Sequence, residues 1–429
     1  MMPSTWLRLL AVYRDRRMLA ILCMGFASGL PLALTGSTFA IWLEEAHVSL
    51  TAIGLFANVG LAYTLKFLWA PVVDRVGLPL LTRALGRRRS WAIAIELALA
   101  AALVALGALD PARAPLALLF ALAALVAFLS ASQDIVIDAY RVELLDELQQ
   151  GAGAAATQVG YRVGMVASTA GALYLATYSG WFASYAIMAG LLVVGIAAVL
   201  MTREPNVAAP ARSASFESAV IAPFAEFVSR EHALAILTFV VLYKLGDALA
   251  GWMSNPFYII LGFSKIEIAN VAKVFGLAAS VAGVIAGGSV VYRLGIMPAL
   301  LICGILQMLS NLMYIVQLWA GPDPAILALT IAVENVTGGM SSAAFVAYLS
   351  RLCNPAFTAT QYALLSALAA APRTLFTASG GYLVERIGWA PFFLLATCLC
   401  VPSLLILWRL MRARPLAPFL PRTGDGAGR

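Results

Sequence analysis

Apolar residues run in long blocks along this chain, and polar residues gather in the short connections between the blocks. A helix of about 20 apolar residues crosses a hydrocarbon core about 30 Å thick, and a membrane-spanning segment must satisfy its own backbone groups. The pattern therefore predicts an all-α polytopic membrane protein with twelve transmembrane helices. The blocks lie near residues 18–43, 50–73, 90–109, 115–138, 153–179, 181–202, 233–260, 267–291, 296–319, 325–350, 358–384 and 389–411.

The composition agrees with this pattern. Hydrophobic residues make up 62% of the chain and charged residues 11%, against roughly 45–50% and about 25% in soluble domains. The first block is longer than a signal-peptide core and holds Trp42 and Glu44 where a cleavage site would need small residues, so we expect it to remain as a helix. The five cysteines lie in or beside apolar blocks without metal-site spacing, which predicts packing roles and no bound metal.

The charges indicate an orientation. An even number of spans places both chain ends on one side, and twenty arginines fall on that side against Arg113, Lys265 and Arg386 on the other. Because cations are enriched on the cytoplasmic side, both termini are predicted to be cytoplasmic. The net charge of +7 then follows from topology and anionic lipid headgroups, and no nucleic-acid partner is expected.

Two weakly similar halves follow each other along the chain. The sequence "RMLAIL" at 17–22 returns as "HALAIL" at 232–237, and "AYRVELL" with Tyr140 returns as "AYLSRLC" with Tyr348. Matches in the same order predict two six-helix pseudo-repeats. The predicted domains are an N-terminal bundle at 1–202, a cytoplasmic linker at 203–231, a C-terminal bundle at 232–414 and a flexible cytoplasmic tail at 415–429.

The loop after the second block carries a further signature. Its sequence "DRVGLPLLTRALGRRRS" holds Asp74 and Arg75, then Gly86 and three arginines, Arg87 to Arg89. Together with the duplicated pattern, this loop resembles that of the major facilitator superfamily, with an insert of about ten residues. Asp74 can cap or pair with neighbouring helix ends, so we expect Asp74 and Arg75 to form a latch that holds the cytoplasmic face shut. For Arg87 to Arg89 we favour a role in topology alone.

Two carboxylates end the fourth block. Asp134 and Asp138 share one helix face with Arg141, and like charges at this spacing repel, so at least one must be neutralised by a proton or a cation. Asp138 lies near the inner headgroups, where we expect it in the cytoplasmic gate with Arg75 or Arg141. Asp134 and its neighbour Gln133 lie a turn deeper, nearer the expected cavity.

Charged side chains inside membrane helices cost at least about 2.5 kcal/mol at the bilayer centre, so each marks a candidate site. We expect Gln133 to bind substrate, and Asp134 either to hold a cation on helix five, Arg162 by preference, or to carry a coupled proton. Arg162 itself is expected in the interior, on substrate or paired with Asp134 or Asp138. The residues predicted to bind or couple substrate are Gly29, Tyr63, Lys66, Gln133, Asp134, Arg162, Lys244, Asp247, Glu334 and Arg373.

For several of these residues the sequence allows two roles. Lys66 holds a carboxylate or extends towards the inner headgroups. Lys244 and Asp247, one turn apart, form a site or neutralise each other. Glu334 pairs with Arg373 across the second half, or titrates as a coupling group.

The positions of glycine, proline and serine predict where helices break and where they pack closely. Glycine and proline interrupt the first block, at Gly29 among others, and the seventh, and breaks in corresponding helices point to the central cavity. Small residues at helical-turn intervals in blocks five and eight allow close backbone approach. In the superfamily that the chain resembles, these helices face each other across the halves, so we expect packing and rocking surfaces there. Their members are Gly160, Gly164, Gly276, Ser280, Gly283 and Gly287.

Four stretches are more specific. "FASGLPLALTGSTFAIWL" (26–43), "YTLKFLWAPVVDR" (63–75), "ASQDIVIDAYRVELL" (131–145) and "GAGAAATQVGYRVGM" (151–165) are similar to the bacterial anhydromuropeptide permeases. The resemblance implies proton-driven import, across the inner membrane of Gram-negative bacteria, of N-acetylglucosaminyl-1,6-anhydro-N-acetylmuramyl peptides (anhydromuropeptides). The resemblance further implies that the cytoplasmic products of the imported cargo enter peptidoglycan recycling. In many species they also supply the signal that induces β-lactamase, and with it antibiotic resistance.

No enzyme is predicted. His47 and His232 lie in loops on opposite sides, and the "GAGAAATQVG" run lacks a preceding strand and a Walker lysine. We therefore expect a monomeric secondary transporter in the lipid bilayer that uses a proton gradient and no cofactor. Another anionic cargo, such as acetyl-coenzyme A or a peptide, and a receptor that binds wall fragments without moving them, remain alternatives.

Overall fold

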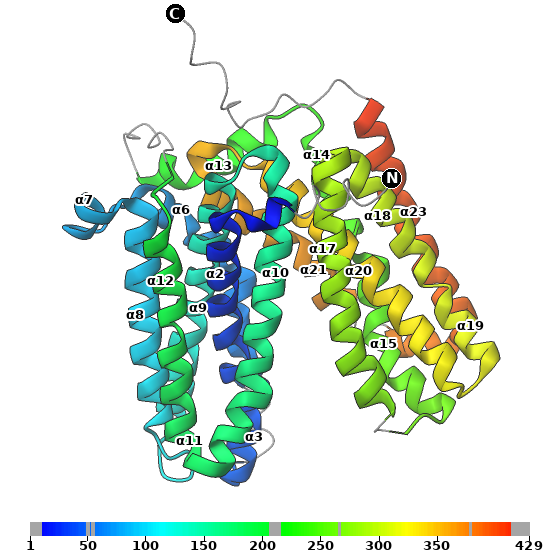
Figure 1. Cartoon of the computed structure of the whole chain (residues 1–429), viewed down its shortest axis with the longest axis horizontal. Coiled ribbons are helices and arrows are strands. Elements are labelled where there is room, and N and C mark those ends of the chain that lie inside the picture. The colour runs from blue at the N-terminus through cyan, green and yellow to red at the C-terminus, as the bar shows by residue number, and fades with distance from the viewer. Residues whose placement is uncertain are drawn as a thin grey trace, which may run out of the picture.

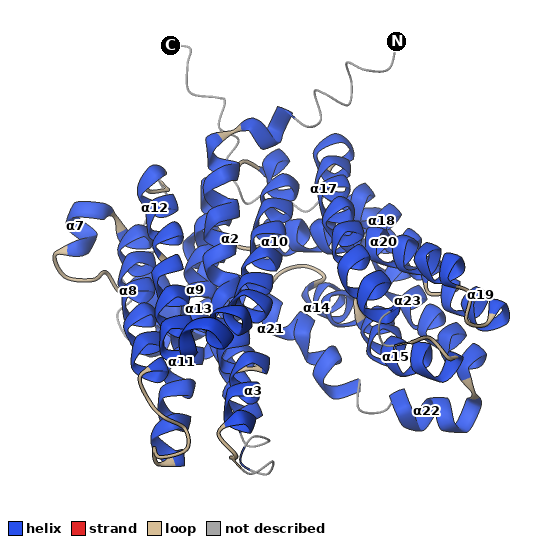
Figure 2. Cartoon of the chain, turned by 60° about the horizontal axis from the view of Figure 1, so that its bottom comes forward, coloured by secondary structure: helices blue, strands red, loops and turns tan. Residues whose placement is uncertain are grey.

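The computed structural model describes residues 11–48, 52, 56–205, 216–264, 267–376 and 380–412, and every regular element in these ranges is a helix (Figures 1 and 2). The predicted all-α fold is confirmed. Helices of the first half of the chain form one bundle and helices of the second half form another (Figure 1).

The helices occupy the positions of the twelve apolar blocks, several of them in more than one piece. The first half contains η1 (Ala11–Arg14), α2 (Arg16–Thr35), α3 (Ser37–Glu45), η2 (Ala57–Gly60), α5 (Leu61–Leu65), η3 (Lys66–Leu68), α6 (Ala70–Arg75), α7 (Leu81–Leu85), α8 (Arg87–Gly107), α9 (Leu116–Leu144), η4 (Glu147–Gln149), α10 (Gln150–Val166), η5 (Ala167–Gly171), α11 (Ala172–Leu191) and α12 (Val193–Met201). The linker and second half contain α13 (Phe216–Val228), α14 (Ala233–Leu242), α15 (Leu245–Leu261), η6 (Ile268–Phe275), α17 (Gly276–Leu294), α18 (Ile296–Ser310), α19 (Met313–Ala320), α20 (Pro324–Leu352), η7 (Pro355–Phe357), α21 (Thr358–Phe376), α22 (Gly380–Ile387) and α23 (Trp389–Arg412).

Eight helical stretches of the described chain are long and apolar enough to cross a membrane. One of them, Glu147–Met201, contains both the fifth and the sixth predicted block. The second, tenth and eleventh blocks are not among the eight. The second block is divided into short α and 3-10 helices, the tenth carries many polar side chains, and the eleventh lies on both sides of the undescribed residues 377–379.

The first and seventh helices are interrupted, as predicted. Gly36, with φ −111° and ψ −111°, separates α2 from α3. In the seventh helix the break is at Lys244, with φ −105° and ψ 4°, rather than at a glycine. Lys244 therefore precedes the first turn of α15, midway along the span Ala233–Leu261.

The two bundles lie closest to each other near the end at which α2 begins and α23 ends (the terminal end), and their ribbons diverge towards the opposite end (Figure 1). Helix α21 packs on α6 and α9, and α10 packs on α17. These contacts join the two halves of the chain, so the terminal end is closed in this conformation.

Part of the linker is a helix. The sequence favours a polar connection at 203–231, but α13 forms within it, because apolar residues such as Phe227, which is fully buried, lie among the polar ones. The Arg230 guanidinium donates to Glu226 (2.7 Å), to the Gln361 side chain (3.1 Å) and to the Leu352 carbonyl (2.5 Å). The linker is thereby fastened to α20 and α21 of the second half.

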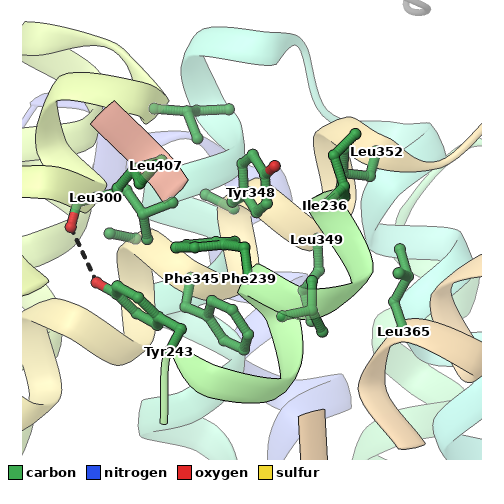
Figure 3. Close-up of a cluster of buried hydrophobic side chains, with 14 of the residues drawn as sticks. Ile236, Phe239, Tyr243, Leu300, Phe345, Tyr348, Leu349, Leu352, Leu365 and Leu407 are labelled. Atoms are coloured by element: carbon green, nitrogen blue, oxygen red, sulfur yellow. Dashed lines mark hydrogen bonds between the residues drawn. The ribbon is translucent and has the colours of Figure 1, made fainter. Parts of the chain in front are cut away.

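The second bundle is held by a buried aromatic cluster (Figure 3). The Tyr243 ring stacks on Phe345 with centroids 5.0 Å apart, and Phe239 meets Tyr348 edge to face at 5.3 Å. The Tyr243 hydroxyl donates to the Leu300 carbonyl at 3.0 Å. Because lipid is as apolar as these side chains, close packing and interhelical hydrogen bonds hold the helices together.

The small residues of helices five and eight pack within their own halves. A Cβ on Gly160 would lie 2.0 Å from a carbonyl oxygen of α2, and Gly164 makes an equally close approach to α2. Gly283 and Gly287 approach the backbone of α20 in the same way. Gly276 and Ser280 also pack against α20. Helices α10 and α17 do face each other across the halves, as expected, but these six small residues pack against α2 and α20 within their own halves.

Other glycines make the contact between the halves. A Cβ on Gly151 would meet Val291 at 2.5 Å, and one on Gly288 would meet the Gly151 carbonyl oxygen at 2.8 Å. The spacing of small residues shows that a helix packs closely, but it does not identify the neighbour.

Candidate functional site

Asp74 joins the two halves at the terminal end. Its carboxylate accepts hydrogen bonds from the main-chain N–H groups of Ala359 (3.1 Å) and Thr360 (2.8 Å) and from the Thr360 hydroxyl (2.7 Å). These donors form the first turn of α21, where the helix dipole favours a negative charge. Asp74 is 1% exposed. The predicted capping role of Asp74 is confirmed, and its partner is a helix of the other half.

Arg88 supplies the counter-charge within the first half. It is 1% exposed, and its Nη2 lies 2.8 Å from Asp74 and 2.5 Å from Glu143. Arg87 also donates to the Asp74 carbonyl. The prediction of a purely topological role for Arg87 to Arg89 is therefore wrong, because the start of α8 points Arg88 between α6 and α9.

The other predicted gate residues lie at the same end. The Arg75 guanidinium lies over the Phe357 ring at 5.6 Å. Arg141 is fully buried, its Nη2 is 3.6 Å from Asp138, and its guanidinium lies over the Tyr362 ring at 5.2 Å. Because Phe357 and Tyr362 belong to the second half, both arginines contribute to the contact between the halves.

Asp134 lies in a polar cluster of the first half. The Ser28 hydroxyl donates to its carboxylate, and the Lys66 ammonium lies 3.9 Å away. Tyr63, one turn before Lys66, lies within electrostatic range of Asp134. The cation on Asp134 is therefore Lys66 of η3, and the preference for Arg162 is wrong. The broken second helix turns Lys66 inwards, so that only 8% of it is exposed.

Gln133 faces the interior of the first bundle. Its side chain is fully buried, and its Nε2 donates to Glu96 of α8 at 3.1 Å. Glu96 is also fully buried and lies against Gly195 of α12. Consecutive helical residues point about 100° apart, so Gln133 and Asp134 face different surroundings. Contact between Gln133 and cargo stays a prediction, and in this conformation its partner is Glu96.

Gly29 packs α2 against α10. A Cβ at this position would lie 2.2 Å from the Tyr161 carbonyl oxygen. The structure therefore gives Gly29 a packing contact, because the close approach of two backbones leaves no room for a side chain.

A second polar cluster surrounds the break in the seventh helix. The Lys244 ammonium donates to Asp247 (3.1 Å) and to the Ser341 hydroxyl (3.1 Å). The Ser341 hydroxyl in turn donates to the Tyr243 hydroxyl at 3.2 Å. The ion pair, one of the two alternatives for these residues, is present, and it is partly exposed, with 22% of the Lys244 side chain and 15% of the Asp247 side chain accessible.

Arg162 of α10 and Glu334 of α20 lie near enough across the two halves for their opposite charges to attract, and Glu334 lies near Lys244 and Asp247 in the same way. The Glu334 carboxylate accepts a hydrogen bond from the adjacent Asn335 amide at 3.0 Å. Arg373 belongs to α21, but its side chain lies outside the described part, so its pairing with Glu334 stays a prediction.

A cavity of about 560 Å³ opens beside the second cluster. Helices α15, α20 and α21 form its walls, Lys244 and Asp247 lie in it, and Tyr362 lies next to the buried Arg141. The described residues contain no group of three or more His, Cys, Asp or Glu side chains placed to hold a metal ion. Lys244, Asp247 and three hydroxyl side chains give the cavity ionic and hydroxyl groups that suit an organic ligand.

Sequence reasoning missed several members of these networks. Glu96 and Ser28 gave no signal, because a single polar residue in an apolar helix does not show which neighbour it faces. Thr360 and Glu143 lie in ordinary helix-end sequences. Glu204 accepts from the N–H groups at the start of α8 (2.7 and 3.1 Å), although it lies in the linker. A capping motif is defined by residues within a few positions of the helix start, so it does not identify partners that are distant in sequence.

Solved structures with the same fold include secondary transporters. A bacterial homologue of the iron transporter ferroportin in an outward-facing state superposes with a TM-score of 0.68 at 13% identity, over 92% of this chain and 98% of that one. The proton:xylose symporter XylE superposes with a TM-score of 0.64 at 12% identity, over 93% and 96%. These similarities concern the fold alone.

Sequence relatives are more specific. The anhydromuropeptide permease of Escherichia coli (strain K12) is 43% identical over 410 residues, which cover 95% of this chain and 81% of that protein. The putative transporter AmpG 4 of Rickettsia conorii is 37% identical over 407 residues, or 94% and 98%. The family model of the Major Facilitator Superfamily matches residues 21–246. The chain therefore belongs to the major facilitator superfamily of membrane transporters and, within it, to the anhydromuropeptide permease family.

Proposed function

We propose that this protein imports anhydromuropeptides across the inner membrane of a Gram-negative bacterium for peptidoglycan recycling. Its 43% identity over 95% of the chain to a permease named for this cargo carries the proposal. That cargo is the relative's, and the two polar clusters of this chain support the same cargo here. An anionic disaccharide peptide needs cations for its carboxylates and hydroxyl or amide partners for its sugars. The clusters around Lys66 and Lys244 supply both kinds of group.

Alternating access follows from the same arrangement. The halves are joined at the terminal end by Asp74 and α21, and we infer that this end is cytoplasmic, with both termini inside. The end at which the ribbons of the two bundles diverge then faces the periplasm, from which cargo would enter. Opening of the Asp74 contact would let the halves rock and release cargo inside. The protein is proposed to act as a monomer in the bilayer, because each chain carries both halves of the pathway.

We further propose that protons drive the import and that no cofactor takes part. Asp134, with Ser28 and Lys66 as neighbours, is the candidate proton carrier of the first half, and Glu334 that of the second. An acid whose cation is only 3.9 Å away can exchange that cation for a proton without a large rearrangement.

Uptake into vesicles tests the proposal. Purified protein in right-side-out vesicles is expected to accumulate radiolabelled anhydromuropeptide under an inward proton gradient, and an uncoupler is expected to abolish accumulation. Empty vesicles are the control. Binding without accumulation would contradict transport, accumulation that resists the uncoupler would contradict proton coupling, and accumulation of acetyl-coenzyme A or free peptide instead would contradict the cargo.

A further inference from the structure

The two polar clusters of the pathway differ in their surroundings. The cluster of the first half is polar throughout, with Ser28, Tyr63, Lys66 and Asp134 close together. The cluster of the second half joins the Lys244–Asp247 ion pair to the Ser341 and Tyr243 hydroxyls, and the ion pair lies at the edge of the mostly apolar cavity of about 560 Å³. The two ends of an elongated cargo would therefore meet different chemistry.

Most residues that line this cavity are apolar. Phe345, Val346 and Leu349 of α20 form one wall, and alanines of α15 and α21 form much of the rest. Hydroxyl groups come from three lining positions, Ser342, Tyr362 and Ser366. A sugar ring carries hydroxyl groups around its edge and loses hydrogen bonds against such walls. An amino-acid chain with methyl and methylene groups and a carboxylate at its end fits them better.

Lys244 is placed to hold that carboxylate. The hydrogen bonds described for its ammonium go to Asp247 and Ser341, which use two of its three donors. Its side chain is 22% exposed and lines the cavity. Asp247 balances the charge while the cavity holds no anion, and a ligand carboxylate would compete with Asp247 for the ammonium.

We propose that the peptide stem of the cargo enters this cavity and places a stem carboxylate on Lys244, while the disaccharide lies towards the cluster of Lys66 and Asp134. This assignment rests on the proposed function and adds an orientation to it. Lys244 then determines the preference for peptide-bearing over peptide-free cargo, and Asp247 weakens that preference by competition.

Transport of two cargoes by matched variants tests the orientation. The cargoes are radiolabelled N-acetylglucosaminyl-1,6-anhydro-N-acetylmuramyl tripeptide and the same disaccharide without peptide. Both are anionic, because the peptide-free form keeps a carboxylate next to its ring. Lys244→Met is expected to lower kcat/KM for the tripeptide form by about tenfold or more, and that for the peptide-free form much less, since a charge-assisted hydrogen bond is lost only from the stem.

Three further variants separate binding from folding. Lys244→Arg is expected to restore most of the tripeptide transport, and Asp247→Asn to lower KM for the tripeptide form several-fold by freeing the ammonium. The double variant Lys244→Met with Asp247→Asn leaves neither charge of the pair without its partner. A loss of tripeptide transport in this variant therefore cannot come from misfolding around an unpaired charge. Lys66→Met, at the disaccharide end, is expected to affect both cargoes alike.

Equal losses for both cargoes in Lys244→Met and in the double variant would overturn the orientation, as would a tripeptide-selective loss in Lys66→Met. The failure of the proposed function has a different signature, because the unaltered protein would then accumulate neither cargo.

Discussion

Substitution of Asp74 by asparagine tests how the terminal end is kept closed. The carboxylate accepts from two main-chain N–H groups and one hydroxyl of α21, and it is 1% exposed. Asparagine keeps only one acceptor oxygen, and its NH₂ group must face a donor of α21 or the Arg88 guanidinium. The closed conformation then contains an orphaned donor that water satisfies once the halves separate.

The size of the effect follows from these contacts. A hydrogen bond to a charged acceptor contributes about 1.5–3 kcal/mol, and a buried donor without a partner costs about 1–3 kcal/mol. We expect Asp74→Asn to weaken the closed state by about 2–4 kcal/mol relative to the open one. Since about 1.4 kcal/mol is a factor of ten, 2 kcal/mol raises the open population about 30-fold.

A native cysteine reports this opening. Cys353 is 1% exposed at the end of α20 and belongs to the same buried cluster as Val142 of α9, so separation of the halves uncovers it. Its rate of alkylation by N-ethylmaleimide, followed by mass spectrometry in detergent, is expected to rise about 30-fold in Asp74→Asn. Cys303 lies in the core of the second half with no exposed area, and its rate reports unfolding.

Asp110→Asn is the matched control. Asp110 forms an ion pair with Arg113 at 3.5 Å, but the two side chains are 55% and 90% exposed, so their pairing contributes little. In Asp110→Asn, Cys353 is expected to be alkylated at the same rate as in the unaltered protein. The reasoning about the latch is refuted if Asp74→Asn alkylates at Cys353 within twofold of the unaltered protein, or if Cys303 accelerates equally.

Three other substitutions test separate parts of the structure. Glu96→Leu leaves the buried Gln133 amide without its acceptor, so we expect it to lower the free energy of unfolding in detergent by about 1–3 kcal/mol. Glu96→Gln keeps an acceptor oxygen and is expected to lower it less. Equal losses in the two variants would argue against the hydrogen bond. Gly160→Ala places a Cβ 2.0 Å from a carbonyl oxygen of α2 and is expected to reduce the monodisperse yield on size exclusion, while Gly190→Ala, with no described atom within 4 Å of the new Cβ, leaves the yield unchanged. Asp134→Asn is expected to fold and to bind cargo but to abolish accumulation under a proton gradient, and normal accumulation would contradict the coupling role.

Block length and composition predict the fold because bilayer thickness fixes how long an apolar helix must be. The second block shows the limit of this rule, since it is divided into short helices that turn Lys66 towards Asp134. An apolar run does not reveal such a break. The helical part of the linker was missed for a related reason, because the prolines and charges around Phe227 favour a loop when they are considered without their neighbours.

Partners of polar residues are harder to predict than their positions. The sequence predicts a cation or a proton on Asp134 and favours Arg162 as the cation, whereas the packed helices place Lys66 there. The sequence does not distinguish the three consecutive arginines after Gly86 from one another. Their side chains point about 100° apart at the start of α8, and only the tertiary arrangement directs Arg88 between Asp74 and Glu143.

The placement of Arg88 explains how the latch can be both buried and reversible. Breaking a buried ion pair costs about 3–5 kcal/mol when one charge is left unpaired. Asp74, Arg88 and Glu143 all belong to the first half, so they stay together when the halves separate. From this network, opening removes only the hydrogen bonds that Asp74 accepts from α21, and water replaces them. The partly exposed Glu147–Arg351 pair, which also crosses between the halves, adds about 1 kcal/mol at most. These polar contacts thus stabilise the closed state by a few kcal/mol, an amount that differential binding of a ligand to the two conformations can offset.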